Sequence, residues 1–415
     1  VAPSTKVTLG ATFDAGSPGG YGSTVNVYTY GSLQSFGSHS HGIVAQSIGG
    51  GGGLIDLSAS EIIFGTASDV SAEGGTVQIY QDPGVSVATS GDYSAGIIAQ
   101  SIGGGGGLAV LSNPNASVTF GNGGLGDGGA VYLTLNGTIQ TSGIGSPGVL
   151  AVSIGGGGGV GFASAASSST DLPIVVTGSG SSEYVVIQLW ATSTNAASIT
   201  TTGAGSDALV ASTIPNSGGL WIQGSEGIGS TLQGSVDGAA IEILVTGYDA
   251  TYPASISSSA ATTVAMLGGC NNCTGINANF LYLENAYSSI TNNGFLNAGM
   301  PAAIDSATDN PNNYWAIYAP YGDNEVYSYG TISGNINLGS NGEMYNYGYL
   351  YSTSMYVGNN SFHNYGSFYP GGYKNTSNAL VDGSLKTYAG SSIYLDVDVL
   401  NTVTSHDTIT VTGLA

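Results

Sequence analysis

Two aspartates near the C-terminal end, Asp396 and Asp398, are spaced so that they could perform acid–base chemistry. They lie two positions apart in IYLDVDVL, and residues two apart on a β-strand project from the same face. A pair of carboxyl groups is the machinery that glycoside hydrolases use. The other carboxylates are scattered singly along the chain, so we favour solvated aspartates on a strand.

The histidines His39 and His41 could form a metal-binding pair on one strand face. The repeats described below place Tyr93 and Ala95 at the equivalent positions, so such a site would be unique to one repeat. We therefore favour loop histidines. Calcium binding is left open, because carboxylates are abundant but no D-x-D-x-D-G loop is present.

The two cysteines, Cys270 and Cys273, lie together in GGCNNCTG. In an oxidising compartment this spacing favours a local disulfide, whereas in the cytosol the pair could be redox-active or half of a zinc site. A structural zinc site normally has four ligands, and the chain has no second cysteine pair. We expect a local disulfide, with free thiols as the alternative, and no cofactor.

The composition excludes several classes of function. The chain has no arginine, three lysines (Lys6, Lys374 and Lys386) and a formal charge of −22, which argues against binding nucleic acid or anionic membranes. Polysaccharide lyases generally need a basic residue beside the uronate, and no Gly-Asp-Ser-Gly protease motif occurs. The sequence therefore predicts a protein that is not an enzyme, and a glycan-degrading enzyme is the third and least favoured hypothesis.

Three runs of five glycines are the most conspicuous feature of the sequence. They end the segments GIVAQSIGGGGG, GIIAQSIGGGGG and GVLAVSIGGGGG, whose last isoleucines are Ile48, Ile102 and Ile154. We expect the three runs to lie above one another at one corner of the fold. They could be flexible surface excursions, which we favour, or a side-chain-free strip that another backbone approaches closely. The candidate contact residues are Gly49, Gly50, Gly51, Gly52 and Gly53; Gly103, Gly104, Gly105, Gly106 and Gly107; and Gly155, Gly156, Gly157, Gly158 and Gly159.

Stacked strands are the elements that would position these residues. Apolar residues alternate with small polar ones, as at Val77 and Ile79, which is the period of a β-strand. Turn residues interrupt the pattern every few positions. Recurrence of the whole pattern predicts a parallel β-solenoid, in which each coil buries its apolar face against its neighbours. A coil of three short strands needs roughly 20 residues, so we expect two to three coils in each ~54-residue repeat of segment 1–325, and about 20 coils in an elongated rod.

Beyond residue 325 the repeat shortens to 18 residues, which predicts one coil per repeat over 326–389. Four tyrosines alternate there in MYNYGYLYSTSMY: Tyr345, Tyr347, Tyr349 and Tyr351. On one strand they would share a face. Outside, they would form an aromatic ribbon suited to stacking on sugars or contacting proteins. Because the asparagine and glycine between them could not fill a core alone, we expect these tyrosines to lie partly inside.

The motifs NYGSF, YSYGTISGNINLG and SIGGGGG resemble the β-helical passenger regions of Gram-negative autotransporters. The most specific likeness is GSSIYLDVDVLNTVTSHDTITVTGLA at 390–415, which is similar to the segment that precedes the outer-membrane barrel in that family. Its matching residues are Asp396, Asp398, Ser405, Asp407 and Thr410 to Gly413. The resemblance implies an all-β, right-handed parallel β-helix, secreted through its own barrel and displayed on the cell surface.

The sequence as a whole therefore predicts a non-enzymatic, extracellular β-solenoid. Its expected role is that of a cell-surface adhesin or structural spacer on a Gram-negative outer membrane, with repeated weak contacts that add by multivalency. The expected partners are a surface protein or glycan of a host or neighbouring cell, its own barrel, and further copies of the chain. The alternative is a self-assembling subunit of a filament, sheath or surface layer.

Overall fold

A computed structural model describes most of the 415 residues. The described ranges are 6–9, 20–57, 61–64, 71–111, 117–120, 126–163, 180–190, 194–214, 220–224, 231–234, 240–244, 254–257, 263–266, 281–284, 288–292, 295–297, 315–320, 323–371, 376–400 and 403–413. Every regular element in these ranges is a β-strand. No membrane-spanning helix is therefore found within them.

Most strands belong to three ladders of hydrogen-bonded neighbours. The first ladder contains β2 (Val25–Thr29), β7 (Val77–Gln81), β12 (Val131–Leu135), β16 (Val185–Leu189), β19 (Leu220–Gly224), β22 (Ala254–Ser257), β25 (Ser288–Asn292), β28 (Asn324–Ser328) and β31 (Glu343–Asn346). The second contains β3 (Leu33–Ser35), β8 (Ser86–Thr89), β13 (Thr138–Thr141), β17 (Ser198–Thr201), β20 (Thr231–Gly234), β23 (Thr263–Met266), β26 (Phe295–Asn297), β29 (Thr331–Ser333), β32 (Tyr349–Ser352), β34 (Ser367–Pro370) and β36 (Ser392–Ile393). The third contains β4 (Ile43–Ile48), β9 (Ile97–Ile102), β14 (Val149–Ile154), β18 (Leu209–Ile214), β21 (Ile241–Leu244), β24 (Leu281–Glu284), β27 (Trp315–Tyr318), β30 (Asn335–Asn337) and β39 (Thr408–Val411).

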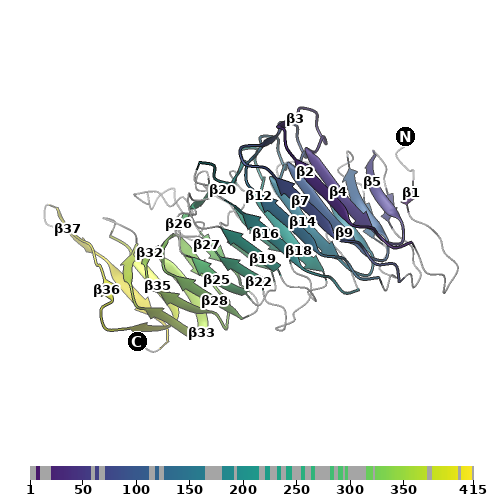
Figure 1. Cartoon of the computed structure of the whole chain (residues 1–415). Helices are drawn as coiled ribbons and strands as arrows, with labels where there is room; N and C mark the ends of the chain where they lie inside the picture. Colours follow the sequence, from purple (N-terminus) through teal and green to yellow (C-terminus); the bar gives the residue numbers. More distant parts are fainter. Residues whose placement is uncertain are drawn as a thin grey trace.

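Two long strands, β33 (Ser354–Asn364) and β35 (Asn378–Thr387), join the first ladder to the third, so that these two ladders form one 20-stranded sheet. Every pairing in the three ladders is parallel. Figure 1 shows the strands stacked side by side in an elongated array, with the N-terminal strands at one end and the C-terminal strands at the other. The fold is thus all-β with parallel strands in stacked sheets, an arrangement compatible with a β-solenoid.

Each 54-residue repeat contributes one strand to each ladder, because Ile43 pairs directly with Ile97, and Ile97 with Val149. The expectation of two to three coils per repeat is therefore wrong. Within the described ranges the second ladder contains 11 strands, fewer than the 20 coils expected from the sequence. The chain alternates between the ladders in the order β2, β3, β4 and then β7, β8, β9.

The residues that made the repeats too long for one coil form two additional small sheets. One contains β5 (Gly52–Leu57), β10 (Gly106–Leu111) and β15 (Gly158–Ala163), and the other contains β1 (Lys6–Leu9), β6 (Glu61–Phe64) and β11 (Ser117–Phe120). A repeat such as β2 to β6 thus has five strands rather than three. Both sheets are parallel and in register from repeat to repeat.

A continuous apolar core lies between the three ladders. Val77 of the first, Val87 of the second and Ile97 of the third are fully buried in it, and the same cluster continues to Leu385. Removing such a side chain from water contributes about 1.5–3 kcal/mol. The ladders and core cross residue 325 without interruption, so the segments 1–325 and 326–389 belong to one continuous stack.

The third ladder is buried on both faces in the second and third repeats. Ile98 and Ile102 of β9 point away from the main core, yet both are fully buried in a second apolar cluster with Leu108, Val160 and Phe162. The sheet of β5, β10 and β15 supplies the cover. Double burial explains why IIAQSI and VLAVSI are continuously buried, as is usual for strands covered on both sides.

Candidate functional site

The glycine runs form the tight connections from the third ladder to the sheet of β5, β10 and β15. Gly104 and Gly105 have φ angles of 77° and 90°, and Gly106 has a φ angle of 150°, all in a region that side chains disfavour. The runs also contact one another: the Gly105 N–H donates to the Gly49 carbonyl at 2.7 Å, and the Gly157 N–H to the Gly103 carbonyl at 2.7 Å. Backbone from successive repeats occupies the space where side chains would stand.

Burial of these runs corrects the favoured interpretation of them as flexible surface excursions. All five glycines of the second run and all five of the third are buried, and Gly49 and Gly50 of the first run are buried as well. The runs do lie above one another, with Gly106 paired to both Gly52 and Gly158. The close-approach interpretation holds only in part, since the approaching backbone is the chain's own. Runs two and three thus offer no surface to a partner.

A serine just before each glycine run fixes the corner, and sequence reasoning missed it. The Ser101 hydroxyl donates to the Gly75 carbonyl at 2.7 Å and accepts the Gly129 N–H at 2.8 Å. Ser47 bridges Ser23 and Gly75 in the same way, and Ser153 bridges Gly129 and Glu183. The recurrence of SIGGGGG was the available signal, because three copies of one hydroxyl at one position indicate a shared hydrogen bond.

The four alternating tyrosines lie outside, so the expectation that they lie partly in the core is wrong. Tyr347 is 40% exposed and Tyr349 is 51% exposed. They also do not share one strand: β31 ends at Asn346, and β32 begins at Tyr349 in a different ladder. The intervening residues are the buried ones, as at Met344, Asn346 and Leu350.

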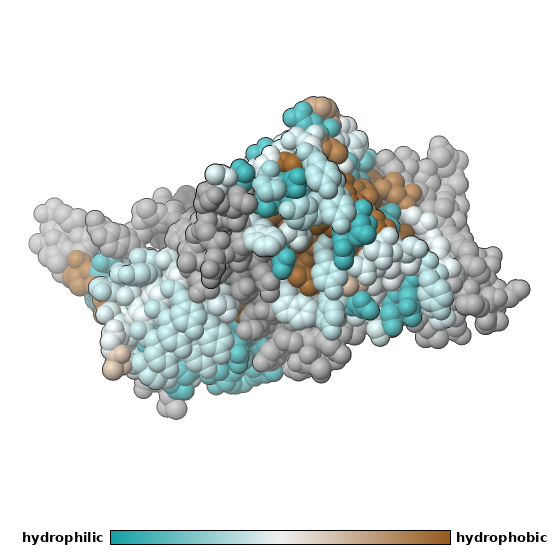
Figure 2. Space-filling view, viewed as in Figure 1, coloured by the Kyte–Doolittle hydropathy of each residue, from teal (hydrophilic) through white to brown (hydrophobic). Residues whose placement is uncertain are grey.

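The tyrosines instead form columns across successive strands, which we call the tyrosine columns. Tyr347 stacks between Tyr329 and Tyr365, with ring centroids 4.8 Å from each. Further stacked pairs are Tyr327–Tyr345, Tyr345–His363, Tyr351–Tyr369, Tyr369–Tyr394 and Tyr365–Tyr388. The pale surface over β28 to β35 in Figure 2 reflects this polar and tyrosine-rich composition. Within a column, the ring faces cover one another, so a sugar could reach mainly the edges and hydroxyl groups.

Buried asparagines fill the corner beside the tyrosine columns. The Asn346 side-chain amide donates to the Asn364 side-chain oxygen at 2.9 Å and to the Ser367 carbonyl at 3.1 Å. Gly348, two positions later, has no room for a Cβ, which would lie 1.9 Å from the Gly330 carbonyl oxygen. The recurring Asn-Tyr-Gly motif therefore has an inward hydrogen-bonding residue, an outward stacking residue and a residue of close backbone contact.

The columns predict that replacing Tyr347 by alanine lowers the free energy of unfolding by about 2 kcal/mol, because two stacked contacts of roughly 1 kcal/mol each are lost. Tyr349→Ala is the matched control, since Tyr349 is similarly exposed but pairs in register with Thr331 and Ser367, which have no rings. Tyr347→Phe should retain nearly all the stability. Urea unfolding measures all three variants, and equal losses at positions 347 and 349 would contradict stacking.

His41 and His39 are not arranged as a metal pair. The His41 Nδ1 atom accepts the Ala95 N–H at 3.0 Å, and its ring packs on Phe162. Burial, and secondarily repulsion by His39, lowers the pKa of His41 to about 4. His39 lies against Tyr93, and both have left-handed backbone with φ angles of 57° and 56°. Within the described ranges, no group of three or more His, Cys, Asp or Glu side chains is placed to hold a metal ion.

The cysteines Cys270 and Cys273 lie outside the described residues, so the disulfide remains a prediction.

The segment that resembles a passenger terminus forms an antiparallel hairpin, β37 (Val397–Leu400) and β38 (Val403–His406), followed by β39, which rejoins the third ladder. Asp398 lies in β37, directly opposite Ser405. The buried Asp407 carboxylate accepts the backbone N–H groups of Ser377 and Asp396, both at 2.7 Å. Burial raises the pKa of the Asp407 carboxyl, and these two hydrogen bonds partly offset the rise. Asp407 therefore links the start of the hairpin, at Asp396, to the residue before β35, at Ser377.

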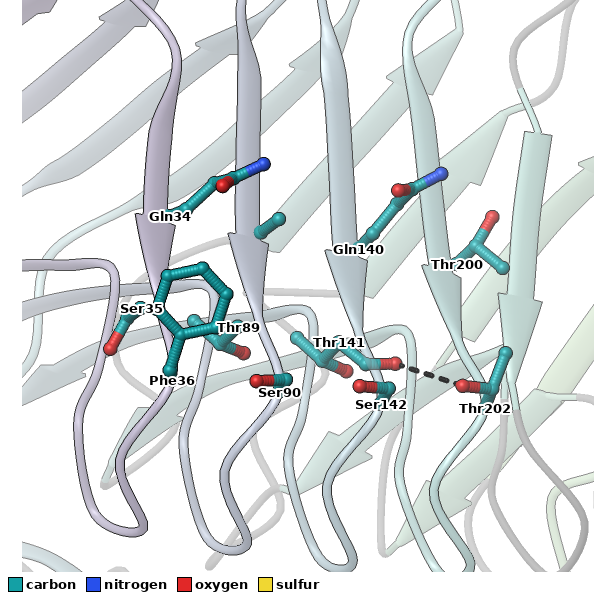
Figure 3. A pocket seen from close by; sticks show the side chains of 11 residues that line it. Gln34, Ser35, Phe36, Thr89, Ser90, Gln140, Thr141, Ser142, Thr200 and Thr202 are labelled. Carbon is teal, nitrogen blue, oxygen red and sulfur yellow. Dashed lines mark hydrogen bonds between the residues drawn. The ribbon is translucent and has the colours of Figure 1, made fainter.

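A shallow hollow of about 310 Å³ lies on the outer face of the second ladder, across β3, β8, β13 and β17. Figure 3 shows side chains from these neighbouring strands lining it side by side. Its lining is Gln34, Ser35, Phe36, Ala88, Thr89, Ser90, Gln140, Thr141, Ser142, Thr200 and Thr202. None of these side chains is ionisable. Sequence reasoning missed the hollow because its residues come from four repeats and none stands out within one.

A second hollow, of about 280 Å³, lies on the first ladder. It is lined by Val27, Tyr28, Gln78, Ile79, Tyr80, Tyr132 and Thr134. Its aromatic rings are less ordered than those of the tyrosine columns, since the Tyr28 and Tyr80 rings are 6.3 Å apart and tilted by 47°. Both hollows therefore lie on the first four repeats.

Comparison with protein-family models, curated proteins and solved structures finds no match to the chain.

Proposed function

We propose that the chain is a right-handed β-solenoid that acts as a non-enzymatic, extracellular adhesin or spacer on a Gram-negative cell surface. The observation that carries the proposal is the uninterrupted register of the ladders, which runs from β3 to β36 in the second ladder. Such a stack holds its outward-facing side chains at fixed intervals, which suits repeated contacts with a partner rather than catalysis. The likeness of 390–415 to passenger termini supports the surface location, and the right hand follows from that resemblance.

The composition of the outer faces supports a role in contact rather than catalysis. Tyrosines, glutamines, serines and threonines face outward along the ladders, and the chain has no arginine. Repeated weak contacts along one scaffold add by multivalency. Partners of this kind are a protein or glycan on another cell, or a second copy of the chain.

The one-coil repeat offers a direct test of the architecture. Deleting residues 344–361 removes 18 residues and joins Glu343 to Phe362, which pairs with Met344 in register. This deletion should leave a folded protein with a β-rich circular dichroism spectrum and a cooperative unfolding transition. Deleting the nine residues 344–352 should abolish folding, because it removes half a coil and the whole of β32, so the strands that follow can no longer return in register to their own ladders. Loss of folding in both variants would contradict the solenoid.

The adhesive role is tested on cells. The chain should be fused to a heterologous outer-membrane barrel in a non-adherent Gram-negative host, and attachment to host-cell layers and between bacteria should be counted. We expect an increase over the barrel alone, whereas no increase in either assay would overturn an adhesin. Electron microscopy of the purified chain separates the alternative, since ordered polymers would favour a self-assembling subunit.

A further inference from the structure

We propose that the hollow on the second ladder binds a neutral, hydroxyl-rich polysaccharide chain that lies along the stacking direction, across β3, β8, β13 and β17. The proposal names a ligand class for the adhesive role and rests on that role only for its biological purpose. Binding in solution depends on the hollow alone.

The register of the ladder makes the hollow. Gln34 pairs with Ala88, Ala88 with Gln140, and Gln140 with Thr200. These positions face outward, between the buried Val87 and Ile139 on one side and the buried Thr89 and Thr141 on the other. The small Ala88 side chain thus leaves a gap one strand wide between two glutamine amides (Figure 3).

Four polar side chains of the hollow are available to a ligand, whereas the hydroxyls of Ser35, Thr89, Thr141 and Thr202 donate to backbone carbonyls of the chain. In the described part of the chain, no hydrogen bond engages the Gln34 or Gln140 amide or the hydroxyls of Ser90 and Ser142. Two glutamines of the other ladders are, by contrast, paired: the Gln46 amide of β4 donates to Gln100 at 2.6 Å, and the Gln81 amide of β7 donates to the Val85 carbonyl at 3.0 Å.

An amide presents both a donor and an acceptor. This combination matches sugar hydroxyls, which also donate and accept.

An exposed ring at the rim adds a surface for the apolar face of a sugar. Phe36 is 75% exposed and lines the hollow beside Ser35. Rings in the tyrosine columns are stacked on one another, whereas Phe36 has no such ring partner within the described residues. Aromatic rings bury large apolar areas on binding. Phe36 can therefore offer its ring face to a sugar, whereas the rings of the tyrosine columns are already covered by one another.

Charge selects a neutral polysaccharide. The hollow has no ionisable side chain, and the chain carries a formal charge of −22. An anionic polysaccharide would meet repulsion with no lysine or arginine in the hollow to offset it. The volume of about 310 Å³ lies at the lower end of the range of small-molecule sites, which suits a short stretch of a chain that continues along the neighbouring strands.

Affinity electrophoresis of the full chain tests the proposal. Native gels should contain hydroxyethyl cellulose, a soluble β-1,3-glucan or galactomannan, with polygalacturonate as the anionic comparison. We expect at least one neutral polysaccharide to retard the protein and polygalacturonate to leave its mobility unchanged. No retardation by any of the three neutral polymers, or retardation by polygalacturonate alone, would overturn the proposal.

Variants localise the binding to the hollow. Ala88→Leu fills the gap and Gln140→Glu removes an amide donor, and each should raise the apparent Kd about tenfold. Gln188→Glu is the matched control, because Gln188 is exposed on β16 of the first ladder and should bind like the unaltered chain. Equal affinity in all variants would place binding elsewhere and refute the hollow. If the chain increases cell attachment but binds none of these polymers, the proposed adhesive role stands and the proposed polysaccharide site in the hollow is refuted.

Discussion

Replacing Gly106 by alanine is expected to lower the free energy of unfolding by about 4 kcal/mol, at the upper end of single-residue effects. A Cβ at this position would lie 1.7 Å from the Gly158 carbonyl oxygen, and the φ angle is 150°. Gly158 pairs with Gly106 in the sheet of β5, β10 and β15, and both glycines are buried. Relief therefore requires separating two paired strands rather than rotating a side chain.

Two other glycines separate the causes of this loss. Gly53 has a φ angle of 147° but nothing within 4 Å of its Cβ position, so Gly53→Ala should cost about 1–2 kcal/mol from backbone strain alone. Gly31 has open space and no left-handed φ angle, so Gly31→Ala should change stability by less than about 0.5 kcal/mol. Chemical unfolding followed by circular dichroism measures the series. If Gly106→Ala cost no more than Gly53→Ala, contact between successive glycine runs would not be what selects glycine.

The strands and their recurrence could be predicted because both follow from local patterns. Alternation at Val77 and Ile79 correctly predicts inward faces, and both residues are buried. The number of coils could not be predicted from length alone. In each of the first two repeats, two of the five strands leave the three ladders and form separate sheets, and a pattern of period two is the same for a strand in either place.

The tyrosines illustrate how an argument from volume fails at a corner. From its volume, asparagine is expected not to fill a core, yet Asn346 is fully buried because its amide hydrogen-bonds to Asn364 on the next strand. Met344 and Leu350, on either side, supply the apolar volume. The relevant partner of each residue lies 18 positions away, so spacing within one repeat could not reveal it.

The hollow was beyond sequence reasoning for a related reason. Its shape depends on Ala88 standing between Gln34 and Gln140, and these residues are 54 and 52 positions from Ala88. Each is unremarkable in its own repeat. A comparison of repeats that looks for similarity passes over such positions, because a recess arises where one repeat differs from its neighbours.

Acidification should destabilise the N-terminal repeats through His41. Burial lowers the pKa of His41 from 6.5 to about 4, so the folded state binds a proton at His41 more weakly than the unfolded chain does. The contribution of neutral His41 to the free energy of unfolding is complete above pH 6.5 and is lost as the pH falls toward 4. A lowering of the pKa from 6.5 to about 4 corresponds to about 3 kcal/mol of stability. Protonation would also place a hydrogen on Nδ1, which accepts the Ala95 N–H.

His41→Asn tests this contribution, because the asparagine oxygen can still accept the Ala95 N–H while the titrating group is removed. Between pH 6.5 and 4, the free energy of unfolding of the variant should fall by about 3 kcal/mol less than that of the unaltered chain. His406→Asn, at an exposed position in β38, should keep the full dependence. Denaturant unfolding at half-unit pH steps provides the measurement. Parallel curves for the unaltered chain and His41→Asn would show that His41 titrates as freely in the fold as outside it, which its burial against Phe162 argues against.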